Sequence, residues 1–210
     1  MKIITVPNQH LRRKAKPIEK VDKKLLKFLK QFNETLSKQD SPKGIGLAAP
    51  QVDKSWRIFA TQLSNRDRTD YQPLRLFINP EIIAHSKKTS FGPDEKKPDL
   101  EGCLSIPALY GPVPRWEWIE LAYQIIENDI SDPEFCSQNS VGMKDTAYKL
   151  VNKKEKFEDF NARVIQHERD HLDGILFTDY ILEHDLPVYK VNEETDKLEE
   201  VKDRNILEIF

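Results

Sequence analysis

The chain has 210 residues, of which 38% are hydrophobic and 32% are charged, and its formal net charge is −2. This composition fits one folded domain with a substantial core and excludes an intrinsically disordered chain. The near balance of charges predicts no general affinity for nucleic acid, and no apolar run approaches the roughly 20 residues of a membrane span.

Cysteine content and the N-terminal segment predict the compartment. Only Cys103 and Cys136 occur, without a C-x-x-C pair, so we expect no disulfide framework. Residues 1–14 contain no apolar segment followed by a cleavage site, so we expect no secretory signal. These features favour a cytoplasmic, reducing environment, in which a single cysteine can remain a thiolate ligand.

The first predicted element is an amphipathic helix from Glu19 to Ser37. Its apolar residues recur at spacings of three and four, and they are Val21, Leu25, Phe28, Leu29, Phe32 and Leu36. Its other face carries Lys20, Lys23, Lys24, Lys27 and Lys30. That face is either solvated or a contact surface for RNA, and the sequence leaves both interpretations open.

Short runs rich in apolar or β-branched residues follow this helix and predict strands. They are Arg57–Leu63, Leu74–Asn79, Trp118–Ile126 and Thr146–Val151. Two intervening stretches are rich in Gly, Pro or polar residues, and they predict loops. They are Ser86–Asp99 and Asn128–Lys144.

A second helix is predicted from Glu158 to Asp173. Its inward face combines two apolar residues with two histidines that advance by four, three and four positions. They are Phe160, Val164, His167 and His171. Beyond this helix, Val188–Val201 contains two strand-like pieces that predict a hairpin. Helices interspersed with short strands, without regular βαβ alternation, indicate an α+β fold.

The strongest chemical signal lies within the second helix, in the sequence QHERDH. His167 and His171 lie one turn apart, so both imidazoles project to the same side and can hold one metal ion. Glu168 follows the first histidine, where it can act as general base toward a metal-bound water. Alternatively, the histidines are polar residues without a metal, although burying two of them without partners would be costly.

A catalytic site of this kind needs a third protein ligand and an open position for water. Phe177 occupies the position where one protease pattern has a third histidine, which excludes that pattern. Glu193 or Glu194 could supply a thermolysin-like ligand, although both lie in a predicted polar turn. Cys103 is the remaining strong donor, and it could equally be a small buried hydrophobic residue.

Three separated motifs together resemble the signatures of the peptide deformylase family, in the order typical of that family. They are Gly44–Gln51 (GIGLAAPQ), Glu101–Ser105 (EGCLS) and Gln166–His171 (QHERDH). The resemblance runs from about residue 1 to about residue 182, which implies a catalytic domain over 1–182 and a C-terminal extension over 183–210 packed on the same domain. The expected fold is α+β, with short, mostly antiparallel β-sheets packed around a central metal-binding helix.

The resemblance implies a metal-dependent hydrolase that removes the formyl group from the N-terminal formylmethionine of nascent polypeptides and releases formate. The implied metal ligands are Cys103, His167 and His171, with a water as the fourth ligand. A thiolate ligand favours Fe(II), Co(II), Ni(II) or Zn(II) over Mg or Ca. Family similarity implies Fe(II) in vivo, and the sequence itself does not separate these ions.

The resemblance also implies the catalytic and substrate-binding residues. Glu168 is expected to move the proton, while the Gln51 side chain and the backbone N–H of Leu104 hold the formyl oxygen. The residues expected to contact the peptide are Ile45, Gly46, Gly102, Phe160, Arg163 and Val164. Arg163 is expected to contribute its aliphatic stem, with its charged head directed to solvent.

Some features depart from the family pattern or leave alternatives. The segment between the second and third motifs is longer than expected, and the surplus falls at Asn128–Lys144, as a surface insertion or an extra wall of the substrate groove. Tyr110 stands where some relatives carry an arginine that contacts the substrate backbone. Arg115 and Glu101 either form a supporting ion pair or are independent surface charges.

The expected partners are formylated nascent peptides, with transient ribosome contact, and neither a membrane nor a sequence-specific nucleic acid is expected. Ribosome docking through a long C-terminal helix is not predicted, because the end of the chain does not have that pattern. Two other functions stay open: a zinc endopeptidase with a different third ligand, and a catalytically silent metal-binding module. The presence of every catalytic position favours an enzyme.

Overall fold

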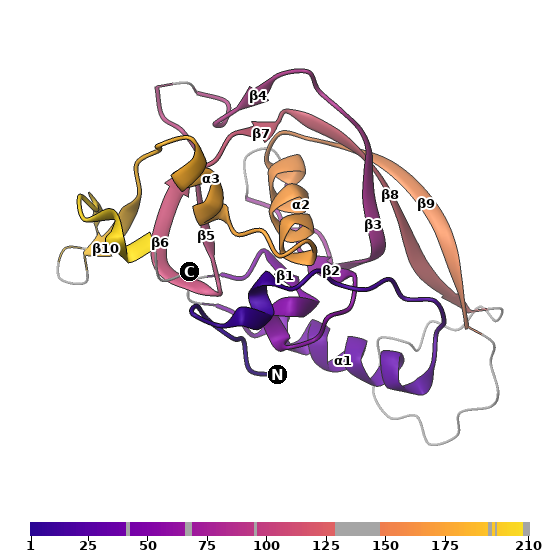
Figure 1. The fold of residues 1–210 in the computed structure, drawn as a ribbon. Helices are drawn as coiled ribbons and strands as arrows, with labels where there is room; N and C mark the ends of the chain where they lie inside the picture. The colour runs from indigo at the N-terminus through magenta and orange to yellow at the C-terminus, as the bar shows by residue number, and fades with distance from the viewer. Residues whose placement is uncertain are drawn as a thin grey trace.

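The computed structural model describes residues 1–40, 43–65, 69–94, 96–128, 148–192, 195 and 197–207. Within them, three antiparallel sheets and the helix α2 (Asp159–Leu172) form most of the fold, and α2 lies between the two larger sheets (Figure 1). This architecture confirms the predicted α+β class with mostly antiparallel sheets. Residues 129–144 of the predicted loop, with Cys136, lie outside the described residues, as do Glu193 and Glu194.

The larger sheet has the strand order β1–β2–β3–β8–β9, and every pairing in it is antiparallel. Its strands are β1 (Gly46–Ala48), β2 (Ile58–Thr61), β3 (Arg75–His85), β8 (Trp118–Asn128) and β9 (Tyr148–Glu158). Each of the predicted strands overlaps one of these, although β3 continues past its predicted end at Asn79 and the predicted start at Thr146 lies outside the described residues. However, β9 extends well beyond its predicted end at Val151, because its charged residues pair in register with the apolar strand β8, as Lys154 does with Ala122.

The smaller sheet has the order β11–β10–β6–β5 and is also antiparallel. Its strands are β5 (Leu100–Cys103), β6 (Ile106–Pro112), β10 (Tyr189–Asn192) and β11 (Lys197–Glu200). Strands β10 and β11 form the predicted terminal hairpin, and β10 pairs with β6 through Tyr189 and Tyr110. The C-terminal segment therefore extends a sheet whose other edge, β5, carries Cys103.

A short third sheet corrects one predicted loop. Strand β4 (Thr89–Ser90) lies within the segment 86–99 and pairs with β7 (Arg115–Trp116). Only two residues of each strand pair, which is too short for an alternating hydrophobic pattern to show in the sequence. The pairing depends instead on contacts between segments that are distant in the chain.

Helix α1 (Lys23–Ser37) begins four residues later than predicted. The Asp22 side chain accepts a hydrogen bond from the Leu25 N–H at 2.8 Å, and this cap sets the start of the helix. The apolar face of the helix packs against β1 and β2. This contact fully buries Phe32 of α1, Leu47 of β1 and Ile58 of β2. The remaining helices are η1 (Gln9–Arg12), η2 (Ala49–Val52), α3 (Phe177–Glu183) and η4 (Arg204–Leu207).

Helix α2 follows β9 directly, and two of its faces have different roles. One face carries Ala162 and Ile165 into the central core, against Phe59 and Phe77 of the larger sheet. The other face carries the histidines toward β5. The helix ends at Leu172.

No helix in the described part of the chain is long and apolar enough to cross a membrane.

Candidate metal centre

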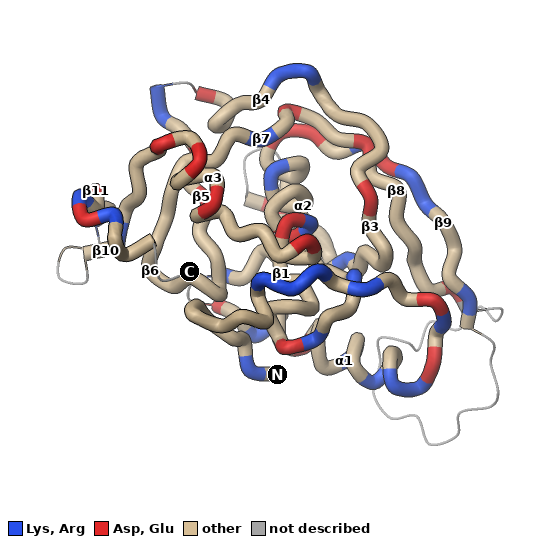
Figure 2. Tube along the Cα trace, in the orientation of Figure 1, with Lys and Arg blue, Asp and Glu red and all other residues tan. Residues whose placement is uncertain are grey.

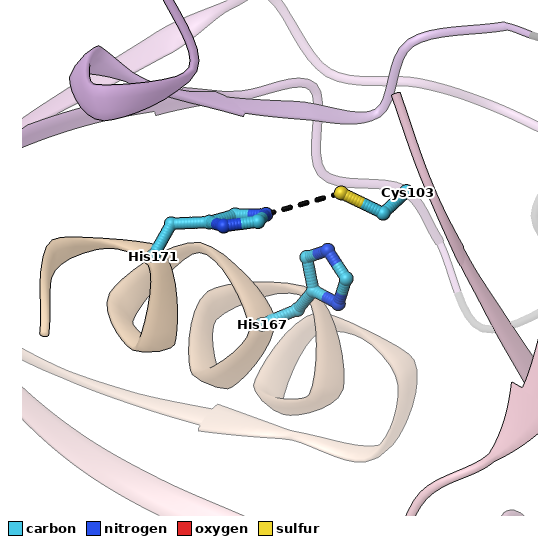
Figure 3. A group of neighbouring side chains, drawn as sticks. All are labelled: Cys103, His167 and His171. Atoms are coloured by element: carbon cyan, nitrogen blue, oxygen red, sulfur yellow. Dashed lines mark hydrogen bonds between the residues drawn. The ribbon is translucent and has the colours of Figure 1, made fainter. Parts of the chain in front are cut away.

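Three potential ligands converge from two elements. Cys103 ends strand β5, while His167 and His171 lie one turn apart on α2. Their ligand atoms all lie within 4.8 Å of one another. Figure 3 shows the Cys103 sulfur directed at His171, and its Sγ is 3.2 Å from His171 Nε2. The fold thus brings together the three residues predicted to be metal ligands.

The donor set and its surroundings fit a transition-metal ion. One sulfur and two imidazole nitrogens suit Fe(II) or Zn(II) and disfavour Mg or Ca. Beside them, Glu168 Oε2 is buried and has no hydrogen-bond partner within the described residues. A buried carboxylate oxygen without a partner is costly, so a water or ligand at this position would stabilise it. Three protein ligands with an open position beside them are typical of catalytic metal sites.

Glu168 is positioned by its contact with strand β1. A Cβ atom at Gly46 would lie 2.2 Å from Glu168 Oε1, so only glycine leaves room for this carboxylate. Burial raises the pKa of Glu168 to about 7. A carboxyl group with such a pKa can both accept and donate a proton near neutral pH. Gly46 was predicted to contact substrate, and the sequence did not indicate its role in seating Glu168.

A buried ionic network holds the ring of His167. The Nδ1 atom of His167 lies 3.0 Å from Glu101 Oε2. Glu101 also accepts hydrogen bonds from Arg115 at 2.9 and 2.8 Å and from Arg163 at 2.9 Å. Arg115 in turn donates to Asp170 at 2.5 Å. With Nδ1 held by Glu101, His167 keeps Nε2 available on the side of Cys103, as supporting carboxylates do for metal-binding histidines.

The network shifts the pKa values of both its carboxylate and the histidine. Burial alone would raise the pKa of Glu101, but Arg115 and His167 outweigh burial and hold this pKa well below its usual range. Burial lowers the pKa of His167, but hydrogen bonds to Cys103 and Glu101 raise it well above its ordinary value, so a metal ion bound at Nε2 would displace a proton from this ring. Glu101 is therefore a permanent anion behind His167.

The structure decides between two alternatives and corrects one prediction. Glu101 and Arg115 are a buried ion pair, not independent surface charges. The predicted exposure of the Arg163 head is wrong: its guanidinium is buried and donates to Glu101, to the Val113 carbonyl at 2.7 Å and to the Ser90 carbonyl at 2.9 Å. Since these acceptors satisfy the charge, Arg163 does not need solvent.

Gln51 is fixed with its amide nitrogen toward the ligands. Its Oε1 accepts a hydrogen bond from the Ala48 N–H at 2.8 Å. Its Nε2 lies 3.2 Å from Ser105 Oγ and 3.5 Å from Cys103 Sγ. Ser105 was not predicted as part of the site, and its position within the EGCLS motif was the only signal for it.

A cavity of about 510 Å³ opens beside these groups. Every residue predicted to contact the peptide lines it, together with the predicted catalytic residues. They are Ile45, Gly46, Gly102, Phe160, Arg163, Val164, Gln51, Leu104 and Glu168. Tyr110, which stands at a substrate-contacting position of some relatives, also lines the cavity. So do Lys43, Tyr71 and Asp99, which no sequence motif indicated as site residues.

The buried network has a testable effect on stability. We expect Glu101→Gln to lower the free energy of unfolding by about 3–5 kcal/mol, because Arg115 and Arg163 lose their buried counter-charge. Urea denaturation at fixed metal content measures this difference. The matched control is Glu155→Gln, which breaks an arginine pair with Arg75 whose carboxylate side chain is 39% exposed, with an expected cost below about 1 kcal/mol. Equal losses in the two variants would contradict the expectation.

Comparison with known proteins gives consistent matches over most of the chain. A profile of the polypeptide deformylase family matches residues 1–134 and 138–186. A peptide deformylase of Pseudothermotoga lettingae is 37% identical over 171 residues, which cover 81% of this chain and 77% of that protein. The peptide deformylase structure from Thermotoga maritima has a TM-score of 0.62 and 30% identity, covering 85% of this chain and 95% of that one. A Met-Ala-Ser-bound peptide deformylase structure from Acinetobacter baumannii has a TM-score of 0.63 and 27% identity, covering 86% and 98%.

Proposed function

This chain belongs to the peptide deformylase family and removes the N-terminal formyl group from nascent peptides, and from that premise we propose how its own residues carry out the reaction. The substrate is a peptide that begins with formylmethionine, and the products are formate and a free N-terminus. The observation that carries the assignment is the approach of Cys103, His167 and His171 to one another beside a cavity that also contains Glu168.

The family is metal-dependent, and in this chain Cys103, His167 and His171 are the proposed ligands. A bound ion would supply Lewis-acid activation of a water molecule and of the formyl carbonyl. The proposed ion in vivo is Fe(II), and Zn, Ni or Co would be accepted by the same donors in a purified sample.

Glu168 is the proposed proton carrier. Its carboxylate accepts a proton from the attacking water and then donates this proton to the departing methionine nitrogen. Its burial and its pKa of about 7 support both roles. Its Oε2, which has no partner among the described residues, would accept a hydrogen bond from this water.

Gln51 and Leu104 are the proposed stabilisers of the oxyanion. As the formyl carbon becomes tetrahedral, the Gln51 amide and the backbone N–H of Leu104 donate hydrogen bonds to its oxygen. One such donor typically contributes about 3 kcal/mol to the transition state. Because the Ala48 N–H holds Gln51 Oε1, the amide nitrogen is already directed to the side of Cys103 and Ser105.

The methionine side chain is proposed to occupy the apolar part of the cavity. Ile45, Phe160 and Val164 offer walls that fit a thioether by shape and dispersion. Arg163 adds its stem but no free charge, because its head is bound to Glu101 and two carbonyls. Gly102 leaves its backbone open to the peptide, and a Cβ there would lie 2.6 Å from the Tyr110 ring.

Formate release tests this proposal directly. We expect formate from formyl-Met-Ala-Ser under anaerobic conditions with iron, and also with nickel. The peptide resembles the Met-Ala-Ser bound in the Acinetobacter baumannii structure. The matched control is acetyl-Met-Ala-Ser, which should release no acetate. Absence of turnover with every metal would contradict the proposal, and cleavage of internal peptide bonds would favour an endopeptidase.

The proposed domain organisation is a catalytic domain over 1–182 with residues 183–210 as an extension packed on it. The pairing of β10 with β6 supports this division, because it joins the extension to the sheet that carries Cys103. The proposed location is the cytoplasm, where formylated nascent chains emerge.

The lysine face of α1 is the proposed contact with the ribosome. Lys23, Lys24, Lys27 and Lys30 are exposed, and Figure 2 shows basic residues along α1 and the segment before it. Such a face attracts the phosphates of RNA in a salt-dependent way. Co-sedimentation with ribosomes tests this: charge reversal at Lys24 and Lys27 should weaken it, and unchanged binding would contradict the proposal.

A further inference from the structure

A lysine at the rim of the cavity has no role in the reaction described above. Lys43 is exposed, and it lines the cavity just before the backbone of Gly44 and Ile45. Its Nζ lies 3.6 Å from the centre of the Tyr71 ring, within the range of a cation–π contact. Within the described part of the chain, no carboxylate lies within salt-bridge distance of this ammonium group. The Tyr71 ring therefore holds this charge in place, and the described residues do not neutralise it.

Lys43 lies within the length of a few extended peptide residues from the reacting end of the cavity. Gly46 contacts Glu168, and Lys43 precedes Gly46 by three positions. Three extended residues span at most about 11 Å. A bound peptide with its formyl group at Glu168 and its chain along the cavity would span up to this length with its second and third residues. Their side chains lie within reach of a long, flexible lysine.

Among the described basic residues that line the cavity, Lys43 is the one whose charge is exposed. Arg163 also lines the cavity, but it is buried and bound to Glu101. Glu168 is buried at the reacting end. A carboxylate on the bound peptide would find its opposite charge at Lys43 and at no other exposed residue of the described cavity lining.

We propose that Lys43, positioned by the Tyr71 ring, selects peptides with Asp or Glu at the second or third residue. This inference deepens the proposed deformylase function and rests on it. Lys43 is a specificity-determining residue in this scheme, and Tyr71 is a positioning residue that acts through it. The two side chains come from the same end of the antiparallel β1–β2 pair, where Gly46 is opposite Thr61: Lys43 lies ahead of β1 and Tyr71 after β2.

Paired peptides that differ in one charge test the inference. We compare kcat/KM for formyl-Met-Glu-Ala-amide with formyl-Met-Gln-Ala-amide, and for formyl-Met-Ala-Glu-amide with formyl-Met-Ala-Gln-amide. The amides remove the terminal carboxylate, so the tested side chain is the only variable charge. We expect a Glu/Gln ratio of about two to five at one of the two positions at low ionic strength, as for a partly exposed ion pair. The ratio should fall toward one in high salt.

Variants of Lys43 and Tyr71 then test whether these residues cause the preference for the acidic peptide. Lys43→Gln should bring the Glu/Gln ratio to about one, and Lys43→Glu should reverse it. Tyr71→Leu should reduce the ratio while Tyr71→Phe keeps it, because phenylalanine retains the ring. Lys87→Gln, at an exposed lysine between β3 and β4, is the matched control and should keep the wild-type ratio.

Two outcomes overturn different claims. A Glu/Gln ratio of one in the wild type, or a ratio that Lys43→Gln does not change, would overturn the role of Lys43 while formate release continues. No formate from any of the four peptides would instead overturn the proposed function on which the inference rests.

Discussion

Replacing Cys103 by alanine is expected to abolish stoichiometric metal binding and to lower formate release by about a thousandfold or more. The thiolate is one of three proposed ligands, and it is the only one that carries a negative charge. The two histidines that remain lie on one helix and hold the ion from one side only. A catalytic metal typically supplies several kcal/mol of transition-state stabilisation, which corresponds to this loss of rate.

Metal analysis and activity on the same preparation measure this prediction. The matched control is Cys136→Ala, which removes the other cysteine of the chain and should keep both the metal and the rate. Circular dichroism should show that the Cys103 variant is folded, because Cys103 is the last residue of the edge strand β5 and is only partly buried. A full metal content in Cys103→Ala would rule out the proposed ligand set and favour a site with a different third ligand.

The sequence could place the two histidines but not the cysteine. A spacing of four on a helix is local, so His167 and His171 necessarily share a face once the helix forms. Cys103 comes from a different sheet, and its approach to α2 depends on how β5 packs beside that helix. Composition alone left Cys103 equally compatible with a buried hydrophobic role. Only its place within a family motif predicted that it would lie beside the histidines.

The error at Arg163 has the same origin. A single arginine on a helix is normally assigned an exposed head, because a buried charge needs several partners. Here the partners come from three distant segments: Glu101 on β5, Ser90 on β4 and the Val113 carbonyl after β6. No local sequence pattern predicts that these three segments meet at Arg163. Lys43 and Tyr71 were missed for a similar reason, because neither belongs to a motif and their contact bridges two loops.

Replacing Glu168 by glutamine is expected to lower kcat by about a hundredfold to ten-thousandfold while metal content stays unchanged. Glutamine has nearly the same shape as glutamate, so it fits the space beside Gly46 that a larger side chain would not. It cannot accept the proton of the attacking water, and it cannot return one to the amine. KM should change little, because the lost interaction belongs to the transition state and not to peptide binding.

Folding stability separates this catalytic role from a structural one. Glu168 is 4% exposed, and its Oε2 has no partner among the described residues, so its ionised form is destabilising in the folded chain. Glu168→Gln should therefore keep or raise the free energy of unfolding, in contrast to Glu101→Gln, which should lower it. Glu183→Gln, at an exposed residue that ends α3, is the control and should leave kcat unchanged. A Glu168→Gln enzyme with kcat within about tenfold of wild type would mean that another group carries the proton, because general acid–base catalysis contributes more than that.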